Sequence, residues 1–224
     1  MSRYQSASTP VIAVDIPMVG ATYFGVDNYK SGYMAGVALG EWIKFYWEGN
    51  VDRLLVLEEP RAGDLPAARI QGQIEGLQSV VGEITEEQKV FLDSGNTSET
   101  SEAQVTKALN NFSDEHKLAV ISFNDDAAYG ALKAARQLSR EDDVVIVGQG
   151  ADRKVRPEIR DPNSRIIGST AFMPEKYGDK LILIAQKILR GESVPPATFI
   201  DHTFISINNV DLFYPEQETK TIER

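Results

Sequence analysis

Three polar residues, Asn124, Asp125 and Asp126, stand where an apolar run ends and a helical pattern begins. Residues 118–123 before them predict a buried strand, and the segment after them predicts a helix. Either aspartate can cap that helix and complement its dipole, or contact a ligand at the strand end. Asn124 differs, because its amide offers donors and an acceptor together, which suits a hydroxylated ligand. We therefore expect Asn124 to bind a ligand.

Other residue types that could do chemistry are isolated along the chain. His116 and His202 have no second histidine or acidic cluster at the spacing of metal ligands, and cysteine is absent. Adjacent side chains at a helix start point in different directions, so Asp125 and Asp126 are poor candidates for an acid-base pair. The stretch "GQGAD" is too short for a dinucleotide fingerprint. The sequence predicts no catalytic residue, no metal and no cofactor, and we expect a protein that is not an enzyme.

Composition narrows the class of partner. The 224-residue chain has a formal charge of −10 and no basic run, which argues against a nucleic-acid partner. With 42% hydrophobic and 25% charged residues, it has the composition of a globular protein. No stretch approaches the roughly 18 to 20 apolar residues of a membrane span. The first ten residues lack the apolar core of a secretion signal.

Short β-branched runs alternate with longer segments of helical period along the chain. This alternation predicts an α/β fold with a parallel sheet flanked by helices on both faces. Ser101 and Gln104 have the spacing of a capping box, and Pro174 suits a first helical turn. The predicted strands are 11–15, 53–58, 89–93, 118–123, 144–148 and 165–170, and the predicted helices are 29–47, 66–81, 101–112, 125–138 and 174–189.

Several stretches, taken in order, resemble one protein family. They are "VIAVD", "GVDNYKSGYMAGVALGEWI", "AGDLPAARIQGQIEGL", "FNDDAAYGALKA", "VVIVGQGAD", "PEKYGDKLILIAQKILRGESVP" and "FISINNVDLFYP". Their order and spacing resemble the type I periplasmic sugar-binding proteins, the ribose- and galactose-binding group of ABC-transporter solute-binding proteins, which is related to lac-repressor-type effector domains. The resemblance extends from about Pro10 to Pro215 and implies a fold of two Rossmann-like lobes.

The resemblance also implies a domain organisation. Residues 1–27 and 171–196 match a remnant of the N-terminal lobe, residues 28–170 and 197–215 match the C-terminal lobe, and residues 216–224 are a tail. Family members carry further residues before the "VIAVD" strand, so the resemblance implies a chain truncated at its N-terminus. We expect a six-stranded or nearly six-stranded parallel sheet in the C-terminal lobe, separate from the "VIAVD" strand.

A partial ligand site follows from the resemblance, residue by residue. Asp15 matches a strand-end aspartate that accepts sugar hydroxyls, Arg69 matches an arginine that donates a fork of hydrogen bonds, and Asn124 matches an asparagine of the second lobe. Such side chains suit sugars, because every hydroxyl both donates and accepts. We expect the three to line one cleft, Asp15 from the remnant and the other two from the C-terminal lobe.

Two further positions of the expected site depart from the ribose-type pattern. Gln149, followed by glycine, stands where those members have Phe-Asp, and Phe172 stands where they have glutamine, so the resemblance does not extend to ribose-like specificity. Phe172 either gives a sugar a stacking face or packs in the core. Arg69 either binds ligand or forms a structural ion pair with Glu58 or Glu59.

The function implied by the resemblance is that of a solute-binding protein, with a sugar or sugar-like ligand held between two lobes by hinge closure. Full-length relatives would act in the periplasm or otherwise outside the cytoplasm, with an ABC-transporter permease as partner. The alternative is the ligand-sensing domain of a lac-repressor-type transcriptional regulator. Since one wall of the cleft lies outside this sequence, we expect weak or absent sugar binding.

We also expect a homo-oligomer through apolar residues left exposed on the remnant, namely Val11, Ile12, Leu181, Ile184 and Ile188.

Overall fold

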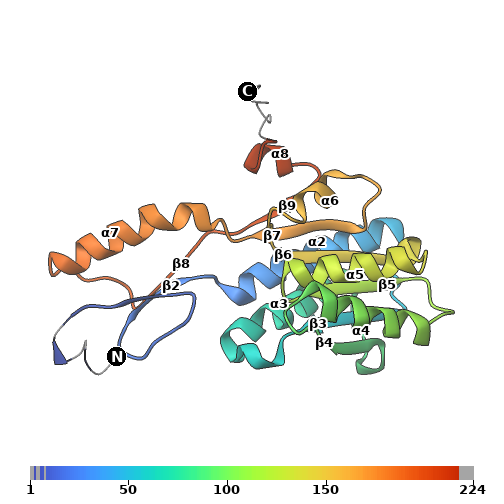
Figure 1. Ribbon diagram of the computed structural model, residues 1–224, viewed down its shortest axis with the longest axis horizontal. Helices are drawn as coiled ribbons and strands as arrows, with labels where there is room; N and C mark the ends of the chain where they lie inside the picture. The colour runs from blue at the N-terminus through green and yellow to red at the C-terminus, as the bar shows by residue number, and fades with distance from the viewer. Residues whose placement is uncertain (1–2, 4–5, 8, 217–224) are drawn as a thin grey trace, which may run out of the picture.

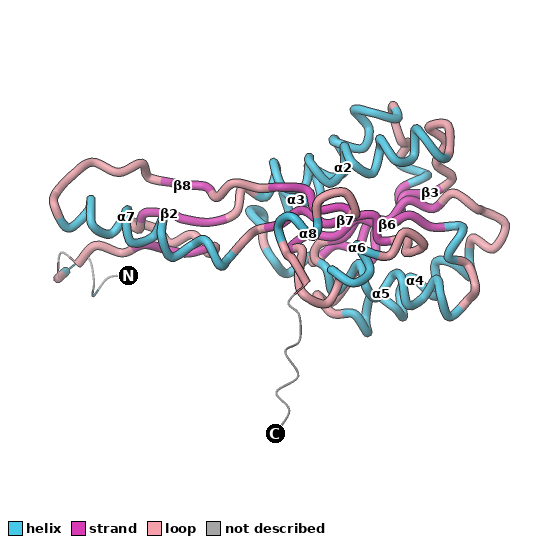
Figure 2. Tube along the Cα trace, turned by 90° about the horizontal axis from the view of Figure 1, so that it is seen from above, coloured by secondary structure: helices cyan, strands magenta, loops and turns pink. Residues whose placement is uncertain are grey.

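The computed structural model describes residues 3, 6–7 and 9–216, and these contain two separate β-sheets (Figure 1). A large unit surrounds a six-stranded sheet, and a small unit surrounds a three-stranded sheet. The chain passes between the units through residues 26–27, 172–173 and 200–202, which we call the crossing segments. The units lie end to end, with the crossing segments between them (Figure 2).

The large sheet has the strand order β4-β3-β5-β6-β7-β9. Its strands are β3 (Arg53–Glu58), β4 (Lys89–Asp93), β5 (Leu118–Ser122), β6 (Val144–Gly150), β7 (Ile166–Ala171) and β9 (Thr203–Ser206). All neighbours pair parallel except β9, which pairs antiparallel with β7. The predicted α/β class and six-stranded sheet are confirmed. The last strand differs from the prediction because it returns from the small unit by a direct crossing, without a helix that would reverse its direction.

Helices cover both faces of the large sheet, as the sequence predicted (Figure 2). One pair is α2 (Asn28–Tyr46) with α3 (Asp64–Val81), and the other is α4 (Ser98–Asn111) with α5 (Asp125–Gln137). Strand β5 shows how the core is divided. Leu118 and Val120 pack toward α4 and α5, whereas Ala119 and Ile121 pack toward α2 and α3. All five residues of β5 are buried, as a strand covered on both faces requires.

Helices α2 and α3 touch backbone to backbone. A Cβ atom on Gly32 would lie 2.0 Å from the Arg69 carbonyl oxygen, and one on Gly36 would lie 2.1 Å from the Gln73 carbonyl oxygen. Only glycine permits such an approach at these positions. The close packing places Asn28, at the start of α2, beside the Arg69 side chain on α3. Glycines at every fourth position of both segments are the sequence signal of this contact, although it did not enter the prediction.

Two predicted helix starts have different outcomes. Helix α4 begins at Ser98 with Thr97 as its cap, so the capping box predicted at Ser101 is wrong. Ser101 is buried instead, and its hydroxyl donates to the Ser94 carbonyl at 3.3 Å. Pro174 does open a helical turn, as predicted, at the start of η4. The shorter elements are η1 (Pro60–Ala62), η2 (Glu86–Gln88), η3 (Glu141–Asp143), α6 (Arg156–Arg160), η4 (Pro174–Lys176) and α8 (Val210–Phe213).

The small sheet has the order β1-β2-β8, with all strands parallel. Its strands are β1 (Ile12–Val14), β2 (Thr22–Gly25) and β8 (Ala197–Phe199), and α7 (Tyr177–Leu189) packs on it. Strands β2 and β8 were not predicted, because three or four residues are too few to show a period. Strand β8 corrects the expected domain boundary, since residues 197–199 pair in the small sheet and not in the large one.

The apolar surface of the small unit also differs from the prediction. Ile12, Leu181, Ile184 and Ile188 were expected to be exposed, but they pack together around Phe24. Helix α7 therefore covers its own sheet with that face. The large apolar side chains exposed on the small unit are instead Val14, Ile16, Met18, Val19, Ile182, Leu183, Leu189 and Phe199.

Candidate functional site

Arg69 occupies the junction between the two units. Its Nε and Nη2 atoms donate to the Asn28 side-chain oxygen at 3.0 and 2.6 Å, and Nη1 donates to the Phe123 carbonyl at 2.9 Å. The guanidinium also lies over two rings, 4.6 Å from the centroid of Phe123 and 5.0 Å from that of Phe172. Asn28 and the two rings fix the position of the charge from three directions. The alternative of an ion pair with Glu58 or Glu59 is wrong, because no ion pair of the described chain joins Arg69 to either residue and Glu59 pairs with Arg61.

The Arg69 guanidinium retains hydrogen-bonding capacity. Of its five N–H groups, three are used by Asn28 and Phe123, and the remaining two have no acceptor among the residues that the structure describes. Burial lowers the pKa of Arg69 to about 10, and nearby Asp15 opposes that shift. The group stays charged at neutral pH. It therefore offers a fixed, largely desolvated pair of donors.

Asp15 faces Arg69 from the small unit. It follows β1 with a positive φ of 59°, a conformation that non-glycine residues seldom adopt and that often marks a functional position. Burial raises the pKa of Asp15, while the Val26 N–H, Arg69 and the Tyr177 hydroxyl act to lower it. The two charges interact without an ion pair within 4.0 Å in the described chain. The structure thus brings Asp15 and Arg69 together from opposite units and leaves a separation between their charged atoms.

Two tyrosines complete this junction. The Tyr23 hydroxyl donates to the Val26 carbonyl at 3.3 Å, and its pKa is raised by burial and by Asp15. Burial and Asp15 also raise the pKa of Tyr177. A Cβ atom on Gly25 would lie 2.6 Å from Asp15 Oδ1 and 2.7 Å from the Tyr23 hydroxyl, so these two groups converge over the glycine. Nothing in the sequence distinguishes Tyr23 and Tyr177 among its eight tyrosines, and they were not predicted.

Asn124 is the cap of helix α5. Its side-chain oxygen accepts from the Ala127 N–H at 2.8 Å, and its Nδ2 donates to the Asn96 side chain at 2.6 Å. The interpretation of an aspartate as the cap is therefore wrong. No hydrogen bond of the described chain joins Asn124 to Asp15 or Arg69, and a ligand role for it stays a prediction.

The two aspartates after Asn124 have separate structural roles. Asp125 is buried, accepts from the Ser169 hydroxyl and from the Asp152 N–H at 2.6 Å each, and thereby ties α5 to β7 and to the loop after β6. Burial raises its pKa to about 7. Asp126 is exposed and pairs with Lys154 at 2.7 Å. They do not share one site, which agrees with the expectation that they are not an acid-base pair.

Gln149 and Phe172 lie at the ends of β6 and β7. Gln149 is buried, and its Nε2 donates to the Ser31 carbonyl at 3.4 Å, while its Oε1 has no partner in the described part of the chain. For Phe172, the alternative of core packing is confirmed, and a stacking face for a sugar stays a prediction. It packs against the core of the small unit and also presents its ring to Arg69.

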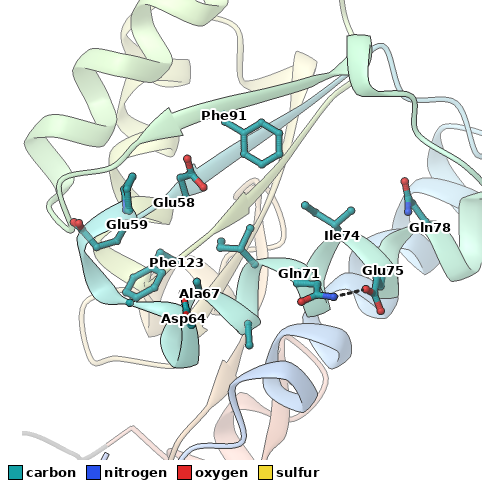
Figure 3. Close-up of a pocket in the computed structure, with 14 residues that line it drawn as sticks. Glu58, Glu59, Asp64, Ala67, Gln71, Ile74, Glu75, Gln78, Phe91 and Phe123 are labelled. Carbon is teal, nitrogen blue, oxygen red and sulfur yellow. Dashed lines mark hydrogen bonds between the residues drawn. The ribbon is translucent and has the colours of Figure 1, made fainter. Parts of the chain in front are cut away.

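A groove of about 660 Å³ lies between α3 and the strands β3 and β4 (Figure 3). Figure 3 shows carboxylates at one end, from Glu58 and Glu59, and the Phe91 ring beside them. None of the predicted site residues lines it. Phe123 connects the groove with the junction, because its ring borders the groove and also lies on Arg69.

The described residues contain no group of three or more histidine, cysteine or acidic side chains that could hold a metal ion. Among the same residues, no helix has the length and apolarity needed to cross a bilayer.

Comparison with sequence families identifies the fold. The sequence model of the periplasmic binding protein domain family matches residues 1–193. The chain belongs to this family. The predicted family and its type I fold are therefore confirmed. A search of curated protein sequences finds no match.

Solved structures share the fold of this periplasmic binding protein domain at low sequence identity. An ABC-transporter periplasmic solute-binding protein from Actinobacillus succinogenes with bound D-allose aligns with a TM-score of 0.79 and 18% identity, over 94% of this chain and 74% of that one. A solute-binding protein from Agrobacterium vitis with bound allitol aligns with a TM-score of 0.78 and 20% identity, over 95% and 72%. A glucose-galactose binding protein from Geobacillus stearothermophilus aligns with a TM-score of 0.69 and 22% identity, over 92% and 71%.

Proposed function

We propose that this chain is the binding component of a sugar ABC transporter, or a part of one, and that it binds an uncharged sugar or polyol at the junction between its two units. One observation carries the proposal. The Arg69 guanidinium, held between Phe123 and Phe172, keeps two unused N–H donors and lies across from the Asp15 carboxylate without touching it.

The residues of the junction match the chemistry of a polyol. A ligand hydroxyl can accept from Arg69 and donate to Asp15, while Phe172 offers an apolar ring to a sugar face. The positive charge of Arg69 and the negative charge of Asp15 balance, which favours a neutral ligand over a sugar acid. The bound sugars and polyols of the structural relatives support the same class of ligand.

Hinge closure is the mechanism that we propose. Asp15 belongs to the small unit and Arg69 to the large one, and the crossing segments join the units. A ligand that contacts both residues binds better when the units approach, so it shifts the population toward a closed form. In the full-length protein, this closed form would be presented outside the cytoplasm to a membrane permease.

Calorimetric titration of the purified chain with D-allose, D-galactose, allitol and myo-inositol tests the proposal. We expect weak but saturable binding of at least one of these compounds, because Asp15 and Arg69 are both in place. Arg69→Met should abolish it. Arg61→Met is the matched control, since Arg61 is exposed and pairs only with Glu59 and Asp93.

Two results would count against the proposal. Heat of binding that survives Arg69→Met would place the ligand elsewhere, for example in the groove beside α3. Tighter binding of galacturonate than of galactose would contradict the preference for a neutral ligand.

A further inference from the structure

His202 connects all three crossing segments. It lies in the third segment, its Nε2 accepts the backbone N–H of Asp27 in the first segment at 3.1 Å, and its ring meets the Phe172 ring of the second segment edge-on at 6.0 Å. Asp27 and His202 are 175 residues apart in sequence. The bond therefore joins parts of the chain that only the fold brings together.

The contacts of His202 continue to Arg69 by two routes. On one side, Phe172 carries its ring against the Arg69 guanidinium. On the other, Asp27 caps α2, whose first residue, Asn28, accepts the fork of hydrogen bonds from Arg69. A change at His202 thus reaches two of the groups that position the Arg69 donors, Phe172 and Asn28.

The hydrogen bond from Asp27 fixes the protonation state of the ring. Because Nε2 accepts, the neutral ring must carry its proton on Nδ1. Nδ1 is buried and meets no acceptor at full hydrogen-bond geometry in the described structure, although the Ala171 carbonyl interacts with the ring. A second proton on Nε2 would point a donor at the Asp27 N–H and break the bond.

The charged groups around the ring act in both directions. Burial lowers the pKa of His202 below its ordinary value, and Lys30 of α2 adds to that effect. Asp27, Asp201 and the Ala171 carbonyl act in the opposite direction. The neutral ring is the favoured form at neutral pH, since burial is the largest of these effects.

We propose that neutral His202 is a positioning residue for the ligand site, and that protonation of its Nε2 releases Phe172 and the start of α2 and so loosens the Arg69 donors. This proposal rests on the ligand site proposed above. The contacts of His202 with the other crossing segments would then make ligand affinity depend on pH.

Nuclear magnetic resonance of the ligand-free chain tests the role of His202 without any sugar. Nitrogen-15 spectra at pH 7.5 should show an unprotonated Nε2 and a protonated Nδ1 on His202. The Arg69 Nε–H signal, assigned by its loss in Arg69→Lys, should be protected from exchange at pH 7.5 and lose protection as His202 titrates below pH 6.5. A protonated Nε2 at pH 7.5 would overturn the proposal.

Ligand titrations with the sugar that binds best give the second readout. The Kd of the wild type should rise from pH 7.5 to pH 5.5, by up to about fivefold once the ring is fully protonated, the size expected for loss of one backbone hydrogen bond. His202→Phe keeps a ring against Phe172 but has no acceptor, so its Kd should be about fivefold higher at both pH values. His202→Gln can accept through its amide oxygen and does not titrate, so it should rescue affinity and give a flat profile.

His116→Gln is the matched control, because His116 is the other of the two histidines and forms an exposed pair with Asp143. It should keep the wild-type profile. If the Kd of His202→Gln depends on pH as that of the wild type does, the positioning role of His202 is overturned. Absence of any sugar binding would refute the proposed function, while the Arg69 Nε–H signal would still decide whether His202 positions that side chain.

Discussion

Helices α5 and α7 have the same length of 13 residues, and their burial differs widely. Helix α5 lies on the large sheet beside α4 and buries eight residues, whereas α7 lies on the small sheet and buries only Ile184. Both sequences have the periodicity of a helix with one apolar face. The difference arises from what each helix meets, because a six-stranded sheet and a partner helix exclude water and a three-stranded sheet does not.

The same contrast applies to the two units as wholes. The large unit has a covered core on each face of its sheet, built from fully buried residues of α2, α3, α4 and α5. The core cluster of the small unit contains four buried residues, namely Phe24, Val26, Ile184 and Ile200. We infer that most of the folding free energy resides in the large unit, since stabilisation follows the apolar area removed from water.

Gly36→Ala, in the large unit, should cause the largest loss of stability. The added methyl group would lie 2.1 Å from the Gln73 carbonyl oxygen, so α2 and α3 would have to separate along their contact. We expect a loss of roughly 3 to 5 kcal/mol in the free energy of unfolding. Urea unfolding followed by tryptophan fluorescence measures it, because Trp42 and Trp47 lie at the end of α2 in the large unit.

Gly178→Ala is the matched control in the small unit. Gly178 lies in helix α7, and a Cβ atom there meets nothing within 4 Å. Since alanine favours helix more than glycine does, this variant should be unchanged or slightly more stable. Equal destabilisation by both substitutions would contradict the assignment of stability to the large unit.

Asp125 should make the stability of the large unit depend on pH. Its folded pKa of about 7 lies above the unfolded value, so its contribution is fully present below the unfolded pKa and is lost as pH rises through about 7. Relative to Asp125→Asn, the wild type should lose roughly 2 to 3 kcal/mol of unfolding free energy between pH 5 and pH 8.

Urea unfolding at several pH values checks this expectation. Asn at position 125 can still bond Ser169 and the Asp152 N–H, so the variant should fold. Asp126→Asn removes an exposed neighbour that pairs with Lys154, and it should keep the wild-type pH dependence. If the unfolding free energy of Asp125→Asn depends on pH as that of the wild type does, the Asp125 carboxylate stays ionised in the folded state.

The smallest expected effect concerns the exposed apolar residues of the small unit. We predict that the chain self-associates through α7, where Ile182 and Leu183 are each 59% exposed and Leu189 is 79% exposed. Leu183→Lys should raise the dissociation constant of self-association about tenfold, because one leucine side chain would no longer be buried on association. Sedimentation equilibrium measures the change. Gln186→Lys adds the same charge at an exposed polar position of α7, and a similar loss in that variant would indicate charge repulsion and not lost apolar contact.

The sequence predicted strands where a run of apolar residues was long enough to be recognised. Strands β3 and β4 have the predicted bounds, β5 ends one residue earlier, and β7 is shifted by one residue at both ends. Strands β2 and β8 were missed because each is short and is stabilised by pairing with a distant segment. The capping box at Ser101 failed for a related reason, since a local pattern does not reveal that Ser101 is buried against β4 and its loop.

The sequence by itself determined the α/β class, the order of the elements and the family, because these depend on local periodicity and on motifs in a fixed order. The family resemblance also predicted that Asp15 and Arg69 belong to one ligand site, and the structure brings their charges near each other. Only the tertiary structure decided the hydrogen bonds around the junction. Asn28 and Arg69 are 41 residues apart in sequence, and Asp27 and His202 are 175 residues apart. Asn124 is the clearest case. Its amide suits both a ligand and a helix cap, and only the three-dimensional positions of Ala127 and Asn96 show that its oxygen caps the helix and its nitrogen donates to another side chain. The sequence determines which side chains can donate or accept, but a hydrogen bond also requires a suitable distance and direction between its atoms. These are set only once the chain has folded.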